Sequence, residues 1–168
     1  DWLMAVEWAD KNGADIIKFQ TFTAESLVTK SADKANYQKS TTNENESQYE
    51  MIKKLELDVK DHIQLIKYSK LKGIAFLSSP FDIESIDLLS SLKIPFYKIP
   101  SGEITNLPFL RHIANMRRKI IMSTGMSTLD EVGKAIKVLL DNGIKKNMIT
   151  VLQCNTDYPT PMEDVNLN

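Results

Sequence analysis

Short apolar segments with β-strand character alternate with longer segments of helical periodicity along most of the 168-residue chain. Strands are predicted at residues 15–22, 74–80, 95–99, 119–123 and 148–153. Helices are predicted at residues 2–11, 48–55, 59–71, 83–92, 107–116 and 128–141. Because helical segments separate each strand from the next, the pattern predicts parallel strands with helices packed outside them.

The later strands recur at intervals of about 22 to 29 residues, which fits a TIM barrel, where roughly 250 residues form eight β/α units. The alternative is a doubly wound open sheet, which usually carries a glycine-rich phosphate turn. The sequence contains no G-x-G-x-x-G and no P-loop motif. About five units cannot close an eight-stranded barrel. We therefore expect residues 1–168 to form a partial TIM (β/α)8-type barrel that lacks its first and last strands and leaves two sheet edges open.

Several residues predict where elements begin and end. Asp82 is placed to cap the helix that follows it, and Thr128 with Glu131 forms a capping box. Residues 31–47 are polar and poor in branched apolar side chains. This composition predicts a long loop that is either a lid or a disordered connection.

Composition argues against some classes of partner. The formal net charge of −1 requires no basic face, so we expect no nucleic acid partner. No apolar run approaches the roughly 20 residues that span a bilayer, so we expect no membrane partner. The single cysteine, Cys154, cannot form an internal disulfide, which fits a reducing, cytoplasmic location.

Two lysines interrupt the apolar strands. Lys18 and Gln20 are two residues apart, so a strand places both side chains on one face. Ile17 and Phe19 then point the other way, toward the helices. A charged lysine is costly to bury without a partner. Its ammonium group therefore either forms a salt bridge inside the barrel or binds an anionic substrate, and Lys98 offers a second cation.

Hydroxyl and amide side chains follow four consecutive strands, at the ends where TIM barrels keep their active sites. These residues are Ser78, Ser79, Ser101, Ser123, Thr124, Asn155 and Thr156. Together with two lysines they would suit a ligand with phosphate and carboxylate groups. Glu103 is the carboxylate nearest to this cluster in sequence, and it is a candidate acid/base, an acceptor for a sugar hydroxyl, or a helix cap.

Three further residues are expected to be structural. His62 and His112 lie on predicted outer helices and lack the spacing of a metal-binding pair, so we expect packing or surface roles. Cys154 follows a strand without a visible histidine partner, so we do not expect it to act as a nucleophile.

Five motifs stand at the ends of the predicted strands. They are Lys18-Phe19-Gln20-Thr21-Phe22, Ser79-Pro80-Phe81-Asp82, Tyr97-Lys98-Ile99-Pro100-Ser101-Gly102-Glu103, Ser123-Thr124-Gly125-Met126 and Gln153-Cys154-Asn155-Thr156-Asp157-Tyr158-Pro159-Thr160-Pro161. Together they resemble the bacterial N-acetylneuraminate (sialic acid) synthase family. The resemblance covers essentially the whole chain and includes Tyr37-Gln38 and Glu46-Ser47-Gln48.

The resemblance implies a TIM-barrel enzyme that condenses phosphoenolpyruvate with N-acetylmannosamine, or a related amino sugar, to give N-acetylneuraminate and phosphate. By motif match, the residues that would hold phosphoenolpyruvate are Lys18, Ser79, Lys98, Ser101 and Ser123. Those that would face the amino sugar are Gln20, Glu103 and Tyr158, with either Asn155 or Thr156. Lys18, Lys98 and Glu103 are the predicted catalytic residues.

The same resemblance implies a divalent metal, Mn2+ or Mg2+, and a homodimer whose C-terminal antifreeze-like domain is absent here. It places the metal ligands outside these 168 residues, so no residue of this chain is predicted to bind metal and this piece alone is expected to be inactive. Three alternatives stay open: a synthase for legionaminic or pseudaminic acid, a Schiff-base aldolase with Lys98 as nucleophile, and a truncated, non-catalytic piece that only binds anions.

Overall fold

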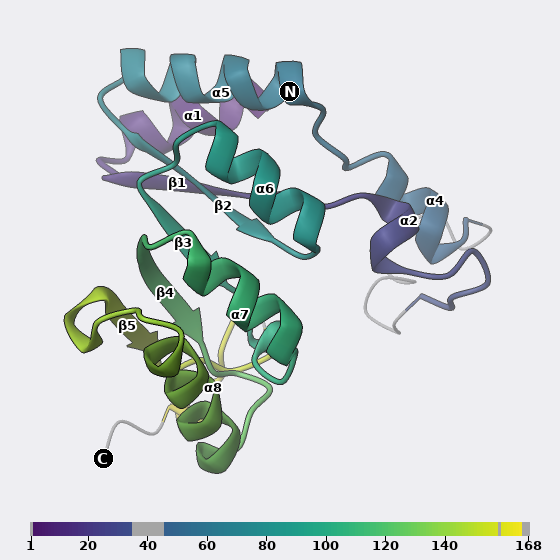
Figure 1. Cartoon of the computed structure of the whole chain (residues 1–168). Helices are drawn as coiled ribbons and strands as arrows, with labels where there is room; N and C mark the ends of the chain where they lie inside the picture. Colours follow the sequence, from purple (N-terminus) through teal and green to yellow (C-terminus); the bar gives the residue numbers. More distant parts are fainter. Residues whose placement is uncertain (1, 35–45, 158, 166–168) are drawn as a thin grey trace.

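A computed structural model describes residues 2–34, 46–157 and 159–165, and it contains five parallel strands in these ranges. The strands are β1 Ile16–Thr21, β2 Ala75–Pro80, β3 Phe96–Ile99, β4 Lys119–Ser123 and β5 Ile149–Leu152. β1 pairs with β2, and β4 pairs with both β3 and β5. β2 and β3 lie side by side without a hydrogen-bonded ladder, so the five strands follow one another around an open arc (Figure 1). The predicted alternation is confirmed, and no closed barrel forms within the described residues.

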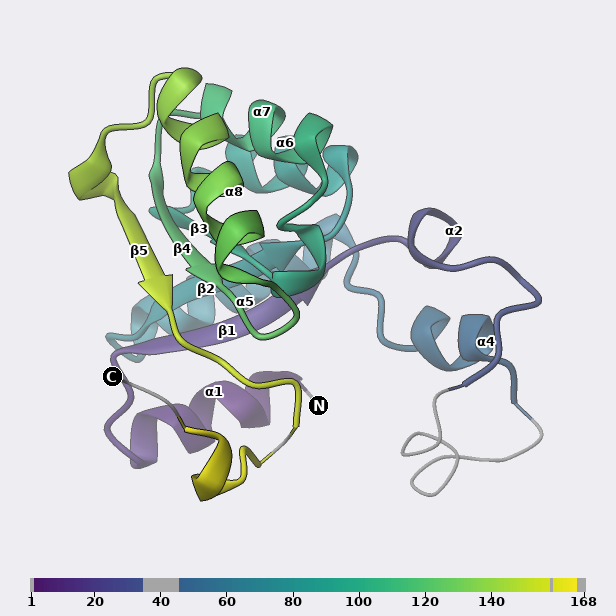
Figure 2. The ribbon, with the colours of Figure 1, turned by 90° about the horizontal axis from the view of Figure 1, so that it is seen from below.

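Helices cover the outer side of the strands. The long ones are α1 Trp2–Lys11, α5 Val59–Leu71, α6 Ile83–Ser91, α7 Leu107–Asn115 and α8 Leu129–Asp141. α5 and α6 pack on β2, α1 packs on β1 and α5, and α7 contacts both α6 and α8 (Figure 2). Short 3-10 turns lie at η1 Ser101–Glu103, η2 Lys146–Met148 and η3 Met162–Asp164. None of the helices described is long and apolar enough to cross a membrane.

Side-chain caps fix where these helices start. The Asp82 carboxylate accepts a hydrogen bond from the backbone N–H of Ser85 at 2.6 Å, as predicted. Thr128 and Glu131 form the predicted capping box at α8. A second box, Asp58 with Asp61, opens α5 and was not predicted. Each cap satisfies backbone N–H groups that a helix start would otherwise leave unpaired.

The two faces of the strands differ in chemistry. On the helix side, the Phe19 and Phe76 rings stack with centroids 5.5 Å apart, and Ile99 and Met122 are completely buried. On the opposite, inner side of β1, Lys18 and Gln20 are exposed. The expectation that Phe19 points toward the helices is therefore confirmed.

A buried histidine ties α5 to the C-terminal ends of β1 and β2. His62 Nδ1 lies 2.7 Å from the Asp58 carbonyl oxygen and therefore donates to it. His62 Nε2 then accepts from the Thr21 hydroxyl at 2.8 Å, and Thr21 Oγ1 lies 2.7 Å from Ser78 Oγ. The expected packing role of His62 is confirmed, and its chain of hydrogen bonds holds together the two strand ends that carry site residues.

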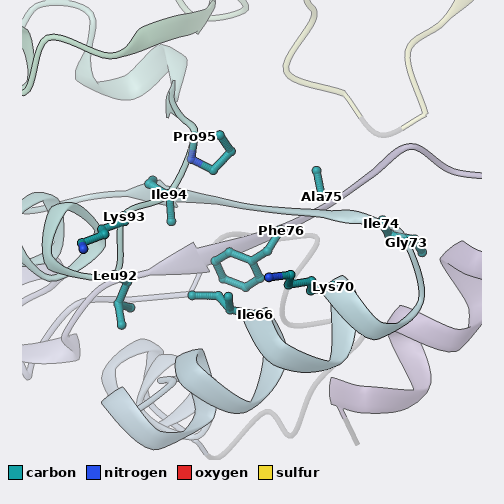
Figure 3. Close-up of a pocket in the computed structure, with 10 residues that line it drawn as sticks. All are labelled: Ile66, Lys70, Gly73, Ile74, Ala75, Phe76, Leu92, Lys93, Ile94 and Pro95. Atoms are coloured by element: carbon teal, nitrogen blue, oxygen red, sulfur yellow. The ribbon is translucent and has the colours of Figure 1, made fainter.

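A pocket of about 370 Å³ lies near the N-terminal ends of β2 and β3 (Figure 3). The pocket lies between α5, the start of β2 and the turn before β3. Its lining includes Ile66, Lys70, Phe76, Leu92 and Ile94. In TIM barrels this end of the strands serves stability, whereas the chemistry sits at the C-terminal ends.

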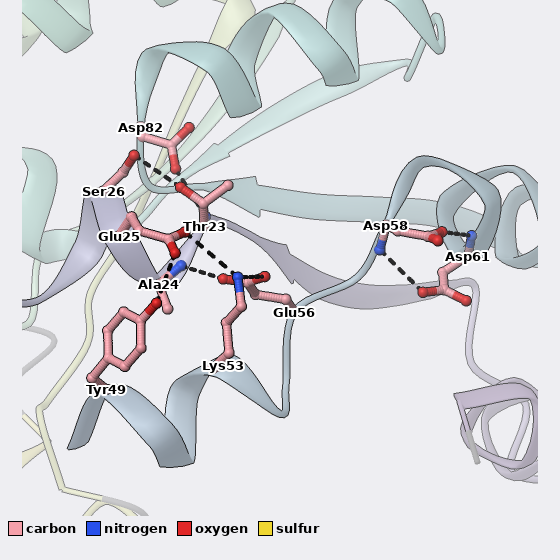
Figure 4. A network of polar contacts seen from close by, with 10 residues as sticks. All are labelled: Thr23, Ala24, Glu25, Ser26, Tyr49, Lys53, Glu56, Asp58, Asp61 and Asp82. Carbon is pink, nitrogen blue, oxygen red and sulfur yellow. Dashed lines mark hydrogen bonds and ion pairs between the residues drawn. The ribbon is translucent and has the colours of Figure 1, made fainter. Parts of the chain in front are cut away.

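Two short helices, α2 Ala24–Leu27 and α4 Gln48–Lys53, lie away from the strands and are joined by polar contacts (Figures 1 and 4). The Glu56 carboxylate accepts from the Ala24 backbone N–H and pairs with Lys53 at 2.9 Å. Glu25 accepts from the Tyr49 hydroxyl at 2.7 Å. Much of the predicted 31–47 loop, including Tyr37 and Gln38, lies outside the described residues, so its role as a lid stays a prediction.

Replacing His62 by leucine is expected to lower the free energy of unfolding by about 1 to 3 kcal/mol, because Thr21 and the Asp58 carbonyl would lose a buried partner. His112 provides a matched control, since its Nε2 lies 2.7 Å from Asp87 at a partly exposed position. His112→Leu should change the unfolding free energy by no more than about 0.5 kcal/mol. Urea denaturation of both variants measures the difference, and equal losses would contradict the structural role of His62.

Candidate functional site

Two lysines project from the inner face of the strands. Lys18 lies in the middle of β1, and Lys98 lies in β3 with 8 % of its surface exposed. Lys98 Nζ donates to the Ile99 carbonyl oxygen at 2.9 Å and to Ser123 Oγ at 2.6 Å. In the described part of the chain, no carboxylate lies within ion-pair distance of either ammonium group. The described residues therefore provide no salt-bridge partner for Lys18.

Burial lowers the pKa of both lysines, and the charge of Lys18 adds to the effect at Lys98. Partial burial lowers the pKa of Lys18. Burial lowers the pKa of Lys98 to about 8, with the positive charge of Lys18 acting in the same direction and Cys154 in the opposite one. Lys18 and Lys98 thus form a positively charged site on the inner face, without a counter-charge from the described residues, and a bound anion would neutralise it.

The strand register decides which serine of β2 faces this site. Gln20 is paired with Ser79, so both side chains lie on the inner face with Lys18. Ser79 is almost fully buried. Ser78 points to the helix side, where it joins the hydrogen bonds of His62. Of the two adjacent serines, the structure thus brings only Ser79 to the inner face.

A pocket of about 350 Å³ opens beside the first of the two lysines. Lys18 and Gln20 line it on the strand side, and Trp2, Phe22 and Leu57 are among its apolar walls. This pocket lies along β1, away from the pocket between β2 and β3. Because Phe19, which faces the helices, lines the same pocket, this space lies along the edge of β1 that is unpaired in the described residues, and not on the inner face alone.

The ends of β4 and β5 are joined by close contacts. The Thr124 hydroxyl donates to the Leu152 carbonyl oxygen at 2.8 Å, and the Cys154 thiol donates to Ser123 Oγ at 3.4 Å. A Cβ atom on Gly125 would lie 2.9 Å from the Asn155 carbonyl oxygen, so only glycine allows this approach. The contact between Cys154 and Ser123 was not predicted, although Ser123 ends β4 and Cys154 follows the neighbouring strand β5.

Glu103 and Ser101 lie in η1, the turn directly after β3. Glu103 Oε2 accepts from the Asn106 side-chain amide at 2.7 Å, and Asn106 Oδ1 accepts from the Phe109 backbone N–H at 3.2 Å. Asn106 is therefore the residue that caps α7, and Glu103 supports that cap. The helix-capping role considered for Glu103 is thus only indirect, since Glu103 holds the residue that caps the helix. The other carboxylate oxygen of Glu103 has no hydrogen bond among the described residues.

The last motif folds back on itself. Asn155 Oδ1 accepts from the backbone N–H groups of Thr156 and Asp157 at 2.5 and 3.0 Å, and its amide donates to Asp164 at 2.8 Å. The Asn155 side chain is thus committed to its own turn, and Thr156 is exposed. Tyr158 lies outside the described residues.

Metal ligands were not predicted within this chain. Among the described residues, no group of three or more His, Cys, Asp or Glu side chains is arranged to hold a metal ion. The described residues therefore do not form a site for the Mn2+ or Mg2+ that the sequence resemblance implies.

The charge of Lys98 is expected to cost stability at neutral pH. Below pH 8 the ammonium group is charged in both the folded and the unfolded chain, and only the folded chain bears its burial. As pH rises from about 8 toward the ordinary value of 10.5, the folded chain releases the proton first and the penalty shrinks. Lys98→Met should therefore raise the free energy of unfolding by about 1 to 2 kcal/mol at pH 7, and by less at pH 10. A gain that does not shrink with pH in urea denaturation would contradict this explanation.

Adding a methyl group at Gly125 should separate the ends of β4 and β5. Gly125→Ala is expected to lower the free energy of unfolding by about 1 to 3 kcal/mol, because the Asn155 backbone must move. Gly133 lies inside α8, and a Cβ atom added there would have no other atom within 4 Å. Gly133→Ala is thus a matched control, and it should raise the free energy of unfolding by about 0.5 to 1 kcal/mol. A Gly125→Ala protein as stable as the unmodified one in urea denaturation would disprove the close approach.

Comparison with known proteins identifies relatives over nearly the whole chain. It is 52% identical to an N,N'-diacetyllegionaminic acid synthase of Campylobacter jejuni, over 96% of this chain and 48% of the relative. It is 46% identical to the enzyme of the same name from Legionella pneumophila, over 95% of this chain and 45% of the relative. A pseudaminic acid synthase of Helicobacter pylori is 32% identical, over 94% of this chain and 46% of the relative. The chain thus spans about half the length of these relatives.

Solved structures share the fold. An N-acetylneuraminic acid synthetase from Leptospira borgpetersenii superposes with a TM-score of 0.80 at 24% identity, covering 98% of this chain and 52% of that one. A truncated 3-deoxy-D-arabino-heptulosonate 7-phosphate synthase from Thermotoga maritima superposes with a TM-score of 0.61 at 9% identity. The match covers 89% of this chain and 44% of that one. At these identities the likeness concerns the fold, and it confirms the predicted partial TIM-type barrel.

The family assignment rests on the sequence. The family model described as "NeuB family" matches residues 5–168, which is almost the entire chain. Together with relatives at 46% and 52% identity, this match confirms the resemblance seen in the strand-end motifs. The chain belongs to the NeuB family, and its relatives include proteins named as synthases of N,N'-diacetyllegionaminic acid, pseudaminic acid and N-acetylneuraminate 9-phosphate.

Proposed function

We propose that the protein carrying this chain condenses phosphoenolpyruvate with an N-acyl amino sugar to form a nine-carbon sugar acid and phosphate. The observation that supports this proposal is the pair of inner-face ammonium groups, Lys18 and Lys98, that have no carboxylate partner in the described residues. Phosphoenolpyruvate carries a phosphate and a carboxylate, so one ligand would neutralise both cations. Family membership provides the reaction type.

The relatives favour a particular amino sugar. The two at 46% and 52% identity are named as N,N'-diacetyllegionaminic acid synthases, so we propose legionaminic acid chemistry over the N-acetylneuraminate reaction that the motifs alone suggested. Phosphoenolpyruvate contributes three carbon atoms and no nitrogen. The six-carbon partner would therefore carry both acetamido groups of such a product. N-acetylneuraminate and pseudaminic acid stay as alternative products.

The residues of this chain would act by holding and neutralising the substrates. Lys18 and Lys98 would bind the anionic groups, with hydroxyl donors from Ser79, Ser101 and Ser123. In the reaction, carbon 3 of phosphoenolpyruvate attacks the sugar aldehyde, water adds at carbon 2, and phosphate leaves by cleavage of a carbon–oxygen bond. Positive charge develops at carbon 2, next to the carboxylate, and ammonium groups cannot stabilise it. The two lysines would therefore act mainly by placing the anionic groups correctly.

The sugar would lie beside the anion site. Gln20 lies on the same inner face as Lys18 and is paired with Ser79, so we propose that it contacts the amino sugar. Glu103, held by Asn106, would offer its other carboxylate oxygen to a sugar hydroxyl. Contacts from Asn155, Thr156 and Tyr158 stay predictions from the family motif.

A divalent metal, the homodimer and a cytoplasmic location also stay predictions for the longer protein. We propose that Mn2+ or Mg2+ is bound there by residues outside these 168, as the family resemblance implies. When bound, such an ion would polarise the aldehyde oxygen.

One rival reaction has a specific observation in its favour. A lysine with a pKa of about 8 is an effective nucleophile, so Lys98 would also suit a Schiff-base aldolase. Borohydride reduction in the presence of pyruvate separates the two reactions, because only the aldolase forms an imine that is trapped as a stable adduct. Mass spectrometry showing that adduct on Lys98 would favour the aldolase.

The direct test uses the complete protein and measures phosphate release from phosphoenolpyruvate with a panel of amino sugars. We expect the diacetamido hexose to give the highest kcat/KM, and Lys98→Met to lower kcat/KM by about 100- to 1,000-fold. In the unmodified protein kcat/KM should fall above pH 8, where Lys98 loses its charge. Lys137→Met, on the exposed side of α8, is the control and should leave turnover unchanged. Normal turnover in Lys98→Met would refute the proposed role of this lysine.

A further inference from the structure

The hydroxyl group of Ser123 has two hydrogen-bond donors directed at it. Lys98 Nζ lies 2.6 Å from Ser123 Oγ, and Cys154 Sγ lies 3.4 Å from the same oxygen. A charged ammonium group can only donate, and oxygen is a better acceptor than sulfur, so the thiol donates as well. The two lone pairs of the hydroxyl oxygen are then both occupied.

The backbone at the end of β5 holds the thiol in this place. The Leu152 carbonyl oxygen accepts from the Thr124 hydroxyl, and the Asn155 carbonyl oxygen packs directly on Gly125. Cys154 lies between these two anchored residues. Its side chain is therefore fixed against Ser123 by contacts on both sides along the chain.

A hydroxyl group with both lone pairs occupied must use its own hydrogen atom elsewhere. The inner face beside Ser123 carries two ammonium groups that have no carboxylate partner in the described ranges, and they would attract an anion. An oxygen atom of that anion is the acceptor that the Ser123 hydroxyl needs. Without the thiol, the hydroxyl could rotate and point its hydrogen away from the anion.

We propose that Cys154 is a positioning residue: its thiol occupies the second lone pair of Ser123 and thereby directs the Ser123 hydroxyl hydrogen toward the phosphate group of the substrate. This inference rests on the proposed function of the anion site. Cys154 itself touches Ser123 and not the reacting atoms, which agrees with the expectation that it is no nucleophile.

The test compares Cys154→Ala with Cys154→Ser in the complete protein. Alanine and serine are nearly the same size, and only serine can donate a hydrogen bond. The affinity for inorganic phosphate is measured by calorimetry, and the KM values for phosphoenolpyruvate and for the amino sugar by steady-state kinetics. We expect Cys154→Ala to weaken phosphate binding and raise the phosphoenolpyruvate KM by about 3- to 10-fold, the usual effect of one hydrogen bond. Cys154→Ser should stay within about twofold of the unmodified protein, and the amino-sugar KM should not change.

A double-mutant cycle separates positioning from packing. If the thiol acts through Ser123, Cys154→Ala should have no further effect on phosphate affinity in a Ser123→Ala background. An equal loss in both backgrounds, or a Cys154→Ser protein as impaired as Cys154→Ala, would overturn the inference. Should Cys154→Ala fail to fold, the shape-matched pair Cys154→Val and Cys154→Thr replaces the first pair.

The same measurements distinguish this inference from the proposed function. An unmodified protein that releases no phosphate with any amino sugar would refute the proposed reaction. The calorimetric phosphate affinities of the variants would still decide the role of Cys154, because they do not depend on turnover.

Discussion

The partly buried ammonium group of Lys98, next to that of Lys18, is the constraint that the rest of this structure must accommodate. Both project from the inner face of parallel strands, and the described residues supply no carboxylate to pair with them. Such a site is unfavourable unless the surrounding structure holds it in place. The helices bury the opposite face of the strands, and His62 ties the ends of β1 and β2 together from that side. The stability of the outer layer thus maintains an inner surface that is suited to an anion.

Much of the fold could be predicted from sequence, because the alternation of strand and helix patterns is regular. The bounds of α1, α5 and β4 agree with those expected, as do the caps at Asp82 and Thr128. The two-residue period of a strand also placed Lys18 and Phe19 on opposite faces. These features follow from local chemistry and from the burial of one face.

The conformations of the strand-end loops could not be predicted in the same way. Sequence alone did not show that Ser78 turns to the helix side, or that Asn155 bonds within its own turn. Nor did it show the thiol of Cys154 against Ser123. These contacts depend on which loops meet after the strands pair, and periodicity carries no information about that. Sequence could thus name candidate residues at the strand ends, but it could not show which of them meet. Lys98 and Ser123 are in contact, whereas Ser78 and Asn155 have other partners.

One anion is expected to neutralise both lysines, and the pKa of Lys98 reports on this directly. NMR of the Lys98 side chain in the complete protein, titrated with and without saturating inorganic phosphate, measures that pKa. We expect a value near 8 in the free protein, which rises by more than one pH unit when phosphate binds. A pKa that is the same in both states, or an ordinary value near 10.5 in the free protein, would contradict this role of the two lysines.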